Sequence, residues 1–161
     1  MGIRVLMTDD DRNLRDLLEE ALMDWGYEVR VAVSGEDALE KIKAERSDIV
    51  ITDLRMPGMG GLKLLEKIKE YDEDILVIVI TGYATIETAV KAIESGAYDY
   101  ITKPFRLDEL MVIMKNASNL LGLTARNRAL LEKLDEAYGE IDNLKDSLSG
   151  TQRPGEIKKK D

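Results

Sequence analysis

Five short apolar segments recur along the chain, separated by longer stretches of mixed polarity. They are rich in β-branched and aromatic residues, which is typical of β-strands, and they cover residues 3–7, 29–33, 49–52, 75–80 and 98–101. The first, third and fourth are almost continuously apolar, which predicts central strands of a parallel sheet that is covered on both faces. The second alternates with Glu28 and Arg30, which favours an edge strand.

Between these segments the apolar residues recur at helical spacing, three or four positions apart. Asp11 and Ser34 are predicted to cap the first two helices at their N-termini. Gly60-Gly61 precedes the third helix, Gly96 ends the fourth, and a fifth helix begins near Leu107. Five alternations of strand and helix predict an α/β domain with a right-handed, doubly wound parallel sheet.

The fifth helix is predicted to continue as a coiled coil. Apolar residues with one polar exception follow a three-four rhythm over four heptads: Leu120, Leu123, Asn127, Leu130, Leu134, Ala137, Ile141, Leu144 and Leu148. A lone Asn at such a position favours two parallel strands, in which Glu140 would face Lys145 of a second copy. The alternative is a single amphipathic helix that folds back on its own domain, with Gly122 as a possible break.

These patterns predict three regions: a domain over residues 1–117, a helical linker or coiled coil over 118–149, and a disordered tail over 150–161. The heptad pattern also predicts that two copies of the chain form a homodimer through the fifth helix and its extension.

Composition narrows the possible chemistry. The 161 residues include no Cys and no His, which excludes disulfides, thiolate sites, imidazole catalysis and the usual zinc ligands. The net charge of -9 disfavours direct nucleic-acid binding, and the longest apolar run is too short to span a membrane. The start of the chain lacks a signal peptide pattern, so a cytoplasmic location is expected.

Candidate functional residues follow the predicted strands directly, where open α/β sheets bind their ligands. Asp9 and Asp10 follow the first strand, Asp53 the third, Thr81 the fourth and Lys103 the fifth. Each taken alone could be an ordinary cap, turn or surface residue. Together, clustered carboxylates suit Mg²⁺, and a carboxylate beside such an ion can accept a phosphoryl group. The pattern therefore favours a magnesium-dependent phosphoacceptor site.

Four segments carry a resemblance to a known family: Thr8-Asp9-Asp10-Asp11, Asp53-Leu54-Arg55-Met56-Pro57-Gly58-Met59, Ile80-Thr81-Gly82-Tyr83 and Asp99-Tyr100-Ile101-Thr102-Lys103-Pro104-Phe105. Together they resemble the receiver domain of two-component response regulators, over about residues 3–117. The resemblance implies a flavodoxin-like sheet with strand order 2-1-3-4-5, in which the first and third strands are neighbours at the switch point.

The resemblance also implies roles for individual residues. Asp53 would be phosphorylated, and it would bind Mg²⁺ together with Asp10, the main chain carbonyl of Arg55 and, largely through water, Asp9. The receiver would catalyse only its own phosphorylation and dephosphorylation, and would not be an enzyme acting on other substrates.

The same family pattern assigns the remaining polar residues. Thr81 would hydrogen-bond the phosphoryl oxygens and Lys103 would pair with them. Tyr100 would turn inward as Thr81 moves, which would remodel the face formed by the fourth helix, fifth strand and fifth helix. Arg55 and Tyr83 occupy variable positions that tune the lifetime of the phosphate in the family.

The implied partner is a sensor histidine kinase, because this chain has no histidine of its own. Residues 53–58, 81–85 and 125–130 most resemble the nitrogen-regulator class, in which a helical linker joins the receiver to an ATPase that activates transcription. No Gly-x-x-x-x-Gly-Lys-Ser/Thr motif follows, so the chain is either part of a longer regulator with a downstream output domain or a stand-alone receiver.

Two other functions remain open at this point. Asp9-Asp10-Asp11 contains the Asp-x-Asp of phosphatases with an aspartate nucleophile, which would be Asp9, although Arg12 and Asn13 follow where those enzymes have Gly and a hydroxyl residue. A coiled-coil adaptor that is independent of phosphorylation is the second alternative.

Overall fold

The computed structural model describes residues 2–150 of the chain. A five-stranded parallel sheet has the order β2-β1-β3-β4-β5, with strands at Arg4–Thr8 (β1), Glu28–Ala32 (β2), Ile49–Thr52 (β3), Leu76–Thr81 (β4) and Asp99–Thr102 (β5). All five predicted strands are present, shifted by one residue at most ends. The predicted fold class and strand order are confirmed.

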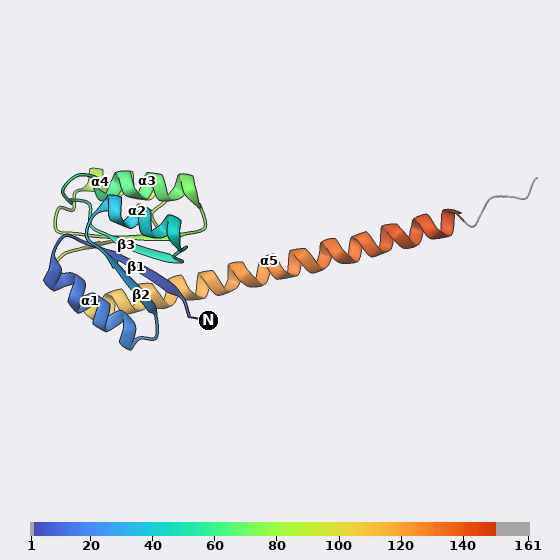
Figure 1. The fold of residues 1–161 in the computed structure, drawn as a ribbon, viewed down its shortest axis with the longest axis horizontal. Helices are drawn as coiled ribbons and strands as arrows, with labels where there is room; N and C mark the ends of the chain where they lie inside the picture. Colours follow the sequence, from blue (N-terminus) through green and yellow to red (C-terminus); the bar gives the residue numbers. More distant parts are fainter. Residues whose placement is uncertain (1, 151–161) are drawn as a thin grey trace, which may run out of the picture. The chain divides into compact units, whose positions relative to one another are not determined.

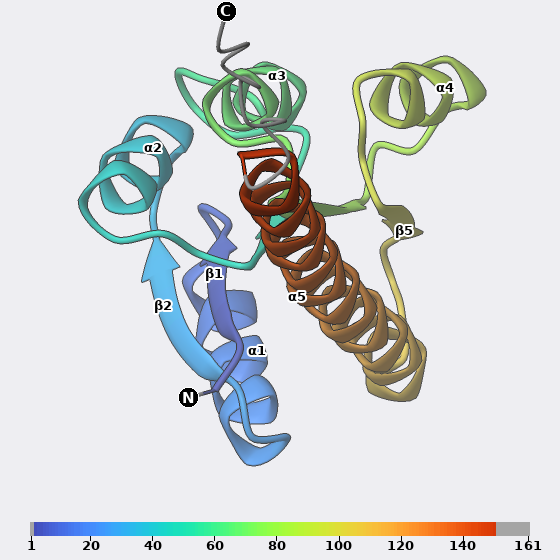
Figure 2. The same ribbon diagram turned by 90° about the vertical axis from the view of Figure 1, so that its right-hand side faces the viewer.

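Helices cover both faces of the sheet. The helices are Arg12–Asp24 (α1), Gly35–Ala44 (α2), Gly61–Tyr71 (α3), Ile86–Glu94 (α4) and Leu107–Gly150 (α5). Figures 1 and 2 show α1 and the first part of α5 on one face, and α2, α3 and α4 on the other. This doubly wound arrangement explains why the central strands are apolar on both sides.

The core confirms which strands are central. Every residue of β3 is buried, as are all but the first residue of β1 and of β4. Strand β2 forms an edge of the sheet and only Ala32 within it is buried, as its alternating sequence predicted. On the α2–α4 face, side chains such as Leu6, Val50 and Leu65 belong to one continuous apolar cluster.

Local sequence determines where the helices begin and end. The Asp11 carboxylate accepts the main chain N–H groups of Asn13 and Leu14, and Ser34 Oγ accepts that of Asp37, so both predicted caps are confirmed. After α4, Gly96 has a φ of 97°, a conformation that side chains with a Cβ rarely adopt. These short-range signals place the loops, and the loops at the strand ends carry the site.

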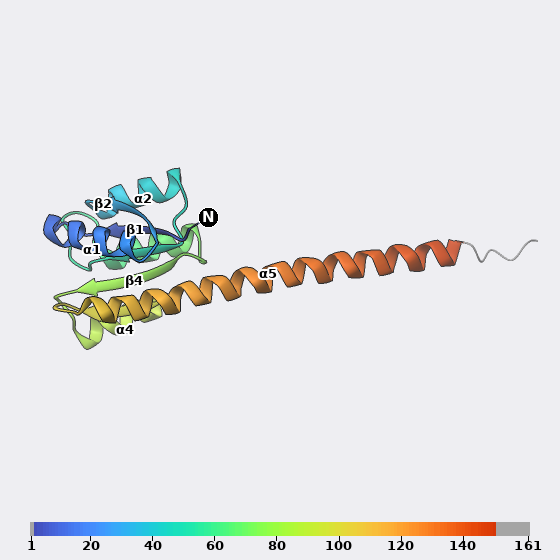
Figure 3. The same cartoon turned by 90° about the horizontal axis from the view of Figure 1, so that it is seen from below.

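All strands run in the same direction, so their carboxyl ends share one edge of the sheet. In Figure 3 the arrowhead of β4 points toward the end of the sheet where α1 and α5 begin. The loops after β1, β3, β4 and β5 therefore meet at this edge, which is where the sequence places its candidate residues.

The chain divides into two compact units, with the boundary between Asn119 and Leu120. Helix α5 crosses this boundary and continues through Gly122 and Gly139, so Gly122 does not break the helix. In the second unit the apolar residues of the heptad pattern are exposed. The predicted tail lies outside the described residues except for Gly150. No helix among residues 2–150 is long and apolar enough to cross a membrane.

Arg46 links two acidic side chains at the edge of the sheet opposite to the candidate residues. Its Nε lies 2.7 Å from Asp72 Oδ2 and its Nη1 lies 2.7 Å from Asp48 Oδ1. Burial alone would raise the pKa of Asp72, but hydrogen bonds from Arg46 and from the main chain of Asp74 more than offset this and lower it. Ionised Asp72 therefore stabilises the fold above its unfolded pKa, and this stabilisation is lost as the pH falls through the folded pKa.

We expect Arg46→Met to lower the free energy of unfolding by about 1 kcal/mol at pH 7, a modest effect because the Arg46 side chain is 39% exposed. The difference from the unmutated chain should shrink at an acidic pH below the lowered folded pKa of Asp72, where this side chain becomes protonated. Urea unfolding at both pH values measures this. Arg12→Met, at an arginine that is 84% exposed, is the control and should have almost no effect at either pH. An Arg46 effect of equal size at both pH values would contradict the assignment.

Candidate functional site

Register between strands brings the acidic residues together. Thr8 of β1 is paired with Thr52 of β3, so Asp9 and Asp53 leave adjacent strands at the same level. On the other side, the main chain N–H of Lys103 donates to the Thr81 carbonyl at 2.8 Å, which aligns the ends of β4 and β5. Residues separated by up to 94 positions in sequence thus meet at one edge of the sheet.

Lys103 lies between the two buried carboxylates. Its Nζ donates to Asp53 Oδ2 at 2.6 Å and to Asp9 Oδ2 at 2.9 Å. Burial alone would lower the pKa of Lys103, but its hydrogen bonds with Asp53 and Asp9 and their negative charges raise it above the ordinary value. Lys103 therefore remains charged and holds both carboxylates in place.

Asp9 is the more deeply buried of the two carboxylates. Burial raises its pKa, and hydrogen bonds from the main chain of Asp11 and from Lys103 oppose this only in part. Its Oδ1 accepts the Asp11 N–H at 2.9 Å while its Oδ2 accepts Lys103. Both oxygens of Asp9 are thus used within the protein, which leaves this side chain poorly placed to react with a ligand.

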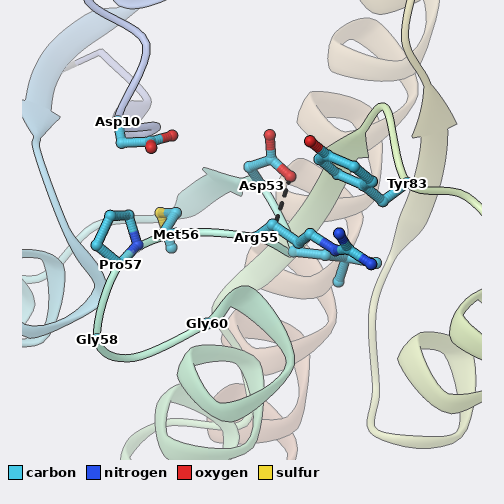
Figure 4. Close-up of a pocket in the computed structure, with 9 residues that line it drawn as sticks. Asp10, Asp53, Arg55, Met56, Pro57, Gly58, Gly60 and Tyr83 are labelled. Atoms are coloured by element: carbon cyan, nitrogen blue, oxygen red, sulfur yellow. Dashed lines mark hydrogen bonds between the residues drawn. The ribbon is translucent and has the colours of Figure 1, made fainter.

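Asp53 and Asp10 face a pocket of about 520 Å³, bordered by the loop from Leu54 to Gly60 and by Tyr83. Figure 4 shows the Asp10 carboxylate on one side of the pocket and the Asp53 carboxylate next to Arg55 and Tyr83 on the other. The Arg55 main chain N–H donates to Asp53 Oδ1 at 3.1 Å, which orients the carboxylate. Asp53 is the carboxylate that is both buried in the protein and open to this pocket.

The oxygen atoms around the pocket fit a magnesium ion. Among residues 2–150, no three acidic side chains are gathered closely enough to form a metal site by themselves. Mg²⁺, however, is usually held by one or two carboxylates and keeps several waters. Asp10, Asp53 and Arg55 line the same pocket, and the main chain carbonyl of Arg55 is the third ligand that the family resemblance predicts. Asp9, whose oxygens are already bonded, fits a role through water.

Tyr83 contacts both Thr81 and Arg55. The buried Thr81 Oγ1 accepts the main chain N–H of Tyr83 at 3.1 Å. The guanidinium carbon of Arg55 lies 3.9 Å from the centre of the Tyr83 ring, a cation–π contact. Within the described part of the chain, no hydrogen bond joins Thr81 to Asp53.

Tyr100 is connected to α4 through a hydrogen bond that the sequence analysis did not anticipate. Its hydroxyl lies 2.9 Å from Thr88 Oγ1. Thr88 and Thr85 bond reciprocally: Thr88 Oγ1 receives the Thr85 N–H, lies 3.0 Å from Thr85 Oγ1, and donates to the Thr85 carbonyl. The Thr-x-x-Thr spacing of this capping box is visible in the sequence and was the available signal for Thr88.

Gly61 is the second residue that sequence reasoning passed over. It was predicted only as part of a helix start, but its Cα faces the main chain of Asp53. A Cβ at this position would overlap the Asp53 carbonyl oxygen and lie 2.8 Å from the carbonyl carbon. The close approach of α3 to the main chain of Asp53 and Leu54 therefore requires glycine.

Comparisons with known proteins show the family to which this domain belongs. The model of the family described as "Response regulator receiver domain" matches residues 5–115. Among curated relatives, the C4-dicarboxylate transport transcriptional regulatory protein DctD of Rhizobium meliloti is 41% identical over 133 residues, which are 83% of this chain and 29% of that protein. The regulatory protein AtoC of Escherichia coli is 38% identical, over 84% of this chain and 29% of that protein. The chain thus spans less than a third of the length of these relatives.

Solved structures show the same fold. NtrX from Brucella abortus has a TM-score of 0.75 and 36% identity, covering 81% of this chain and 30% of that one. A CheY-like receiver domain protein from Methanospirillum hungatei has a TM-score of 0.70 and 33% identity, covering 74% of this chain and 96% of that one. With the matched family model, the shared sheet order and the acidic residues at its edge, this chain belongs to the receiver domains of two-component response regulators.

Proposed function

We propose that Asp53 accepts a phosphoryl group from a phosphohistidine of a separate sensor kinase. The observation that carries this proposal is the environment of Asp53. It is buried at the end of β3, is held by Lys103 at 2.6 Å, and opens onto the pocket that Asp10 also lines. A carboxylate fixed in this way can attack phosphorus without first being ordered.

In the proposed step an oxygen of Asp53 forms a bond to phosphorus, and the phosphorus–nitrogen bond of the donor breaks. The electron pair leaves with the histidine nitrogen. Lys103 and the Thr81 hydroxyl are proposed to contact the transferred oxygens. Asp10, Asp53 and the Arg55 carbonyl, with Asp9 through water, are proposed to bind Mg²⁺, which supplies positive charge where the phosphoryl oxygens gather.

The response is proposed to reach the face formed by α4, β5 and α5. The Tyr100 hydroxyl contacts Thr88 in the first turn of α4, so a movement of Tyr100 would change a hydrogen bond at the start of that helix. On α4, Ile86, Val90 and Ile93 are spaced along one side of the helix and are exposed. An apolar side that is exposed in one state and covered in another is a suitable readout of a switch.

The output is proposed to act through a dimer and a downstream domain. The exposed heptad residues of the second unit, such as Leu134 and Ile141, would be buried by a second copy in a parallel coiled coil. Transcriptional control is proposed because the relatives with this receiver and linker are named as transcriptional regulators. Sedimentation equilibrium of the chain over a range of concentrations tests the dimer, and a monomer throughout would contradict it.

Intact mass spectrometry tests the phosphoacceptor function. The chain is incubated with acetyl phosphate and MgCl₂, and a gain of one phosphoryl group is expected. A chelator added before the donor should prevent the gain, because the carboxylates around the pocket would then repel the donor dianion. No gain in the folded chain would favour the alternative of a coiled-coil adaptor that is independent of phosphorylation.

The phosphatase alternative receives less support from the geometry. Its nucleophile would be Asp9, but both carboxylate oxygens of Asp9 are bonded within the protein, and Asp9 does not line the pocket.

A further inference from the structure

The loop between β3 and α3 borders the phosphoacceptor pocket and is closed at its base by a main chain hydrogen bond. The Gly61 N–H donates to the Leu54 carbonyl at 2.9 Å. The tip of the loop, at Pro57 and Gly58, lines the pocket but is exposed to solvent. Figure 4 shows this tip on the Asp10 side of the pocket. An exposed tip needs a contact of its own if its main chain is to keep one position.

Glu36, in the first turn of α2, supplies such a contact. Its Oε1 accepts the Met59 main chain N–H at 2.8 Å, directly after the tip. Helix and loop also approach each other closely. A Cβ at Gly58 would lie 2.7 Å from Glu36 Oε1, and a Cβ at Gly35 would lie 2.7 Å from the Met59 carbonyl oxygen. Glycine at both positions therefore allows α2 to touch the loop.

The helical turn that carries Glu36 is itself held by reciprocal hydrogen bonds. Ser34 Oγ accepts the Asp37 N–H at 3.1 Å, and Asp37 Oδ2 accepts the Val33 N–H at 3.1 Å. These bonds fix the main chain on both sides of Glu36, as in a capping box. The Glu36 carboxylate is thus presented to the loop from a fixed position, at a helix N-terminus where a negative charge is favoured.

We propose that Glu36 is a positioning residue for Mg²⁺, which acts by holding Met59 and thereby the main chain of the loop. The Arg55 carbonyl belongs to that main chain, so its direction depends on the conformation of the loop and not on a side chain rotamer. The inference rests on the proposed function, in which this carbonyl is a magnesium ligand. It adds a residue of α2 that does not line the pocket and that supports the ligand from outside.

Titration calorimetry of the whole unphosphorylated chain with MgCl₂ tests this without any reaction. Glu36→Ala is expected to raise the dissociation constant about fivefold, the effect of losing one hydrogen bond. Glu36→Gln keeps an oxygen that can accept the Met59 N–H, and should remain within about twofold of the unmutated chain. Glu40→Ala removes the same charge one turn later on α2, from another exposed side chain, and should also remain within about twofold.

Hydrogen exchange of the Met59 main chain amide, followed by NMR without Mg²⁺, gives a second readout. Exchange should be faster in Glu36→Ala and nearly unchanged in Glu36→Gln, because only alanine removes the acceptor. The rate of phosphorylation by acetyl phosphate should follow the same order at subsaturating MgCl₂. At saturating MgCl₂ the rate of Glu36→Ala should return to that of the unmutated chain, since the residue acts through binding of the ion.

Two results would overturn the inference. One is a Glu36→Ala chain that binds Mg²⁺ as tightly as the unmutated chain, whatever the exchange of Met59. The other is a loss in Glu36→Gln or Glu40→Ala as large as in Glu36→Ala, which would assign the effect to charge. An unmutated chain that binds no Mg²⁺ would instead overturn the magnesium site of the proposed function, so the two failures are distinguishable. Glu36 is exposed, and circular dichroism should show that every variant is folded.

Discussion

An Asp53→Asn variant should gain no phosphoryl group under conditions in which the unmutated chain is fully phosphorylated. The amide that replaces the carboxylate is a poor nucleophile and cannot form the acyl phosphate. Its shape is nearly the same, so the contacts with the Arg55 main chain and the Lys103 ammonium can be largely retained. We therefore expect complete loss of the reaction with little change in the midpoint of thermal unfolding.

Asp9→Asn is the matched control for this experiment. The substitution removes the other carboxylate that bonds to Lys103. Asp9 is also the nucleophile in the phosphatase alternative. This variant should still gain one phosphoryl group, although more slowly, because the hydrogen bond to Lys103 and the proposed water-mediated contact with Mg²⁺ are disturbed. A gain that persists in Asp53→Asn and is absent in Asp9→Asn would reverse the assignment of the nucleophile.

Gly61→Ala should destabilise the first unit by about 3 kcal/mol, the upper range for an added methyl group in a tightly packed position. The new Cβ would overlap the Asp53 carbonyl oxygen and lie 3.0 Å from Leu54 Cα. Main chain atoms cannot move aside as a side chain end can, so α3 must shift away from the sheet. The midpoint of thermal unfolding should fall by about 10 °C.

Gly82→Ala is the control for Gly61→Ala, because it adds the same methyl group to the next functional loop. A Cβ at Gly82 would meet only the Lys103 Cβ, at an ordinary 3.9 Å. We expect its thermal midpoint to stay within about 2 °C of that of the unmutated chain, since surface changes away from special contacts have small effects. Differential scanning calorimetry compares the three proteins. Equal midpoints for both variants would show that the loop accommodates a side chain at Gly61.

The fold could be predicted because its determinants are local and periodic. The almost continuous apolar character of residues 49–52 and 75–80 identified strands covered on both faces, and these are the central β3 and β4. Caps such as Asp11 and Gly96 act within a few residues of their own position, so their chemistry can be read from the sequence. The heptad rhythm predicted that the fifth helix continues, but whether Gly122 would break it could not be read in this way, because glycine weakens a helix without forbidding it.

The site was predictable in its members but not in its contacts. Acidic residues and Lys103 at strand ends indicated which side chains would gather, since parallel strands end together. That Lys103 joins Asp9 to Asp53, and leaves Asp10 to face the pocket, depends on distances between residues far apart in sequence. The contact between Arg55 and Tyr83 similarly requires two loops to approach each other. Contacts between such distant loops cannot be predicted from the spacing of apolar residues along the chain.

The hydrogen-bonding capacity of Thr88 has a consequence for how easily Tyr100 can move. A threonine hydroxyl can donate one hydrogen bond and accept two. Four groups surround Thr88 Oγ1: the Thr85 N–H, carbonyl and hydroxyl, and the Tyr100 hydroxyl. Thr88 Oγ1 thus has four neighbouring groups but can form only three hydrogen bonds. When Tyr100 moves away, the three groups of Thr85 can still provide all three. Tyr100 can then leave at less than the usual cost of a broken hydrogen bond, about 1 kcal/mol, and α4 keeps its cap whichever way the ring turns.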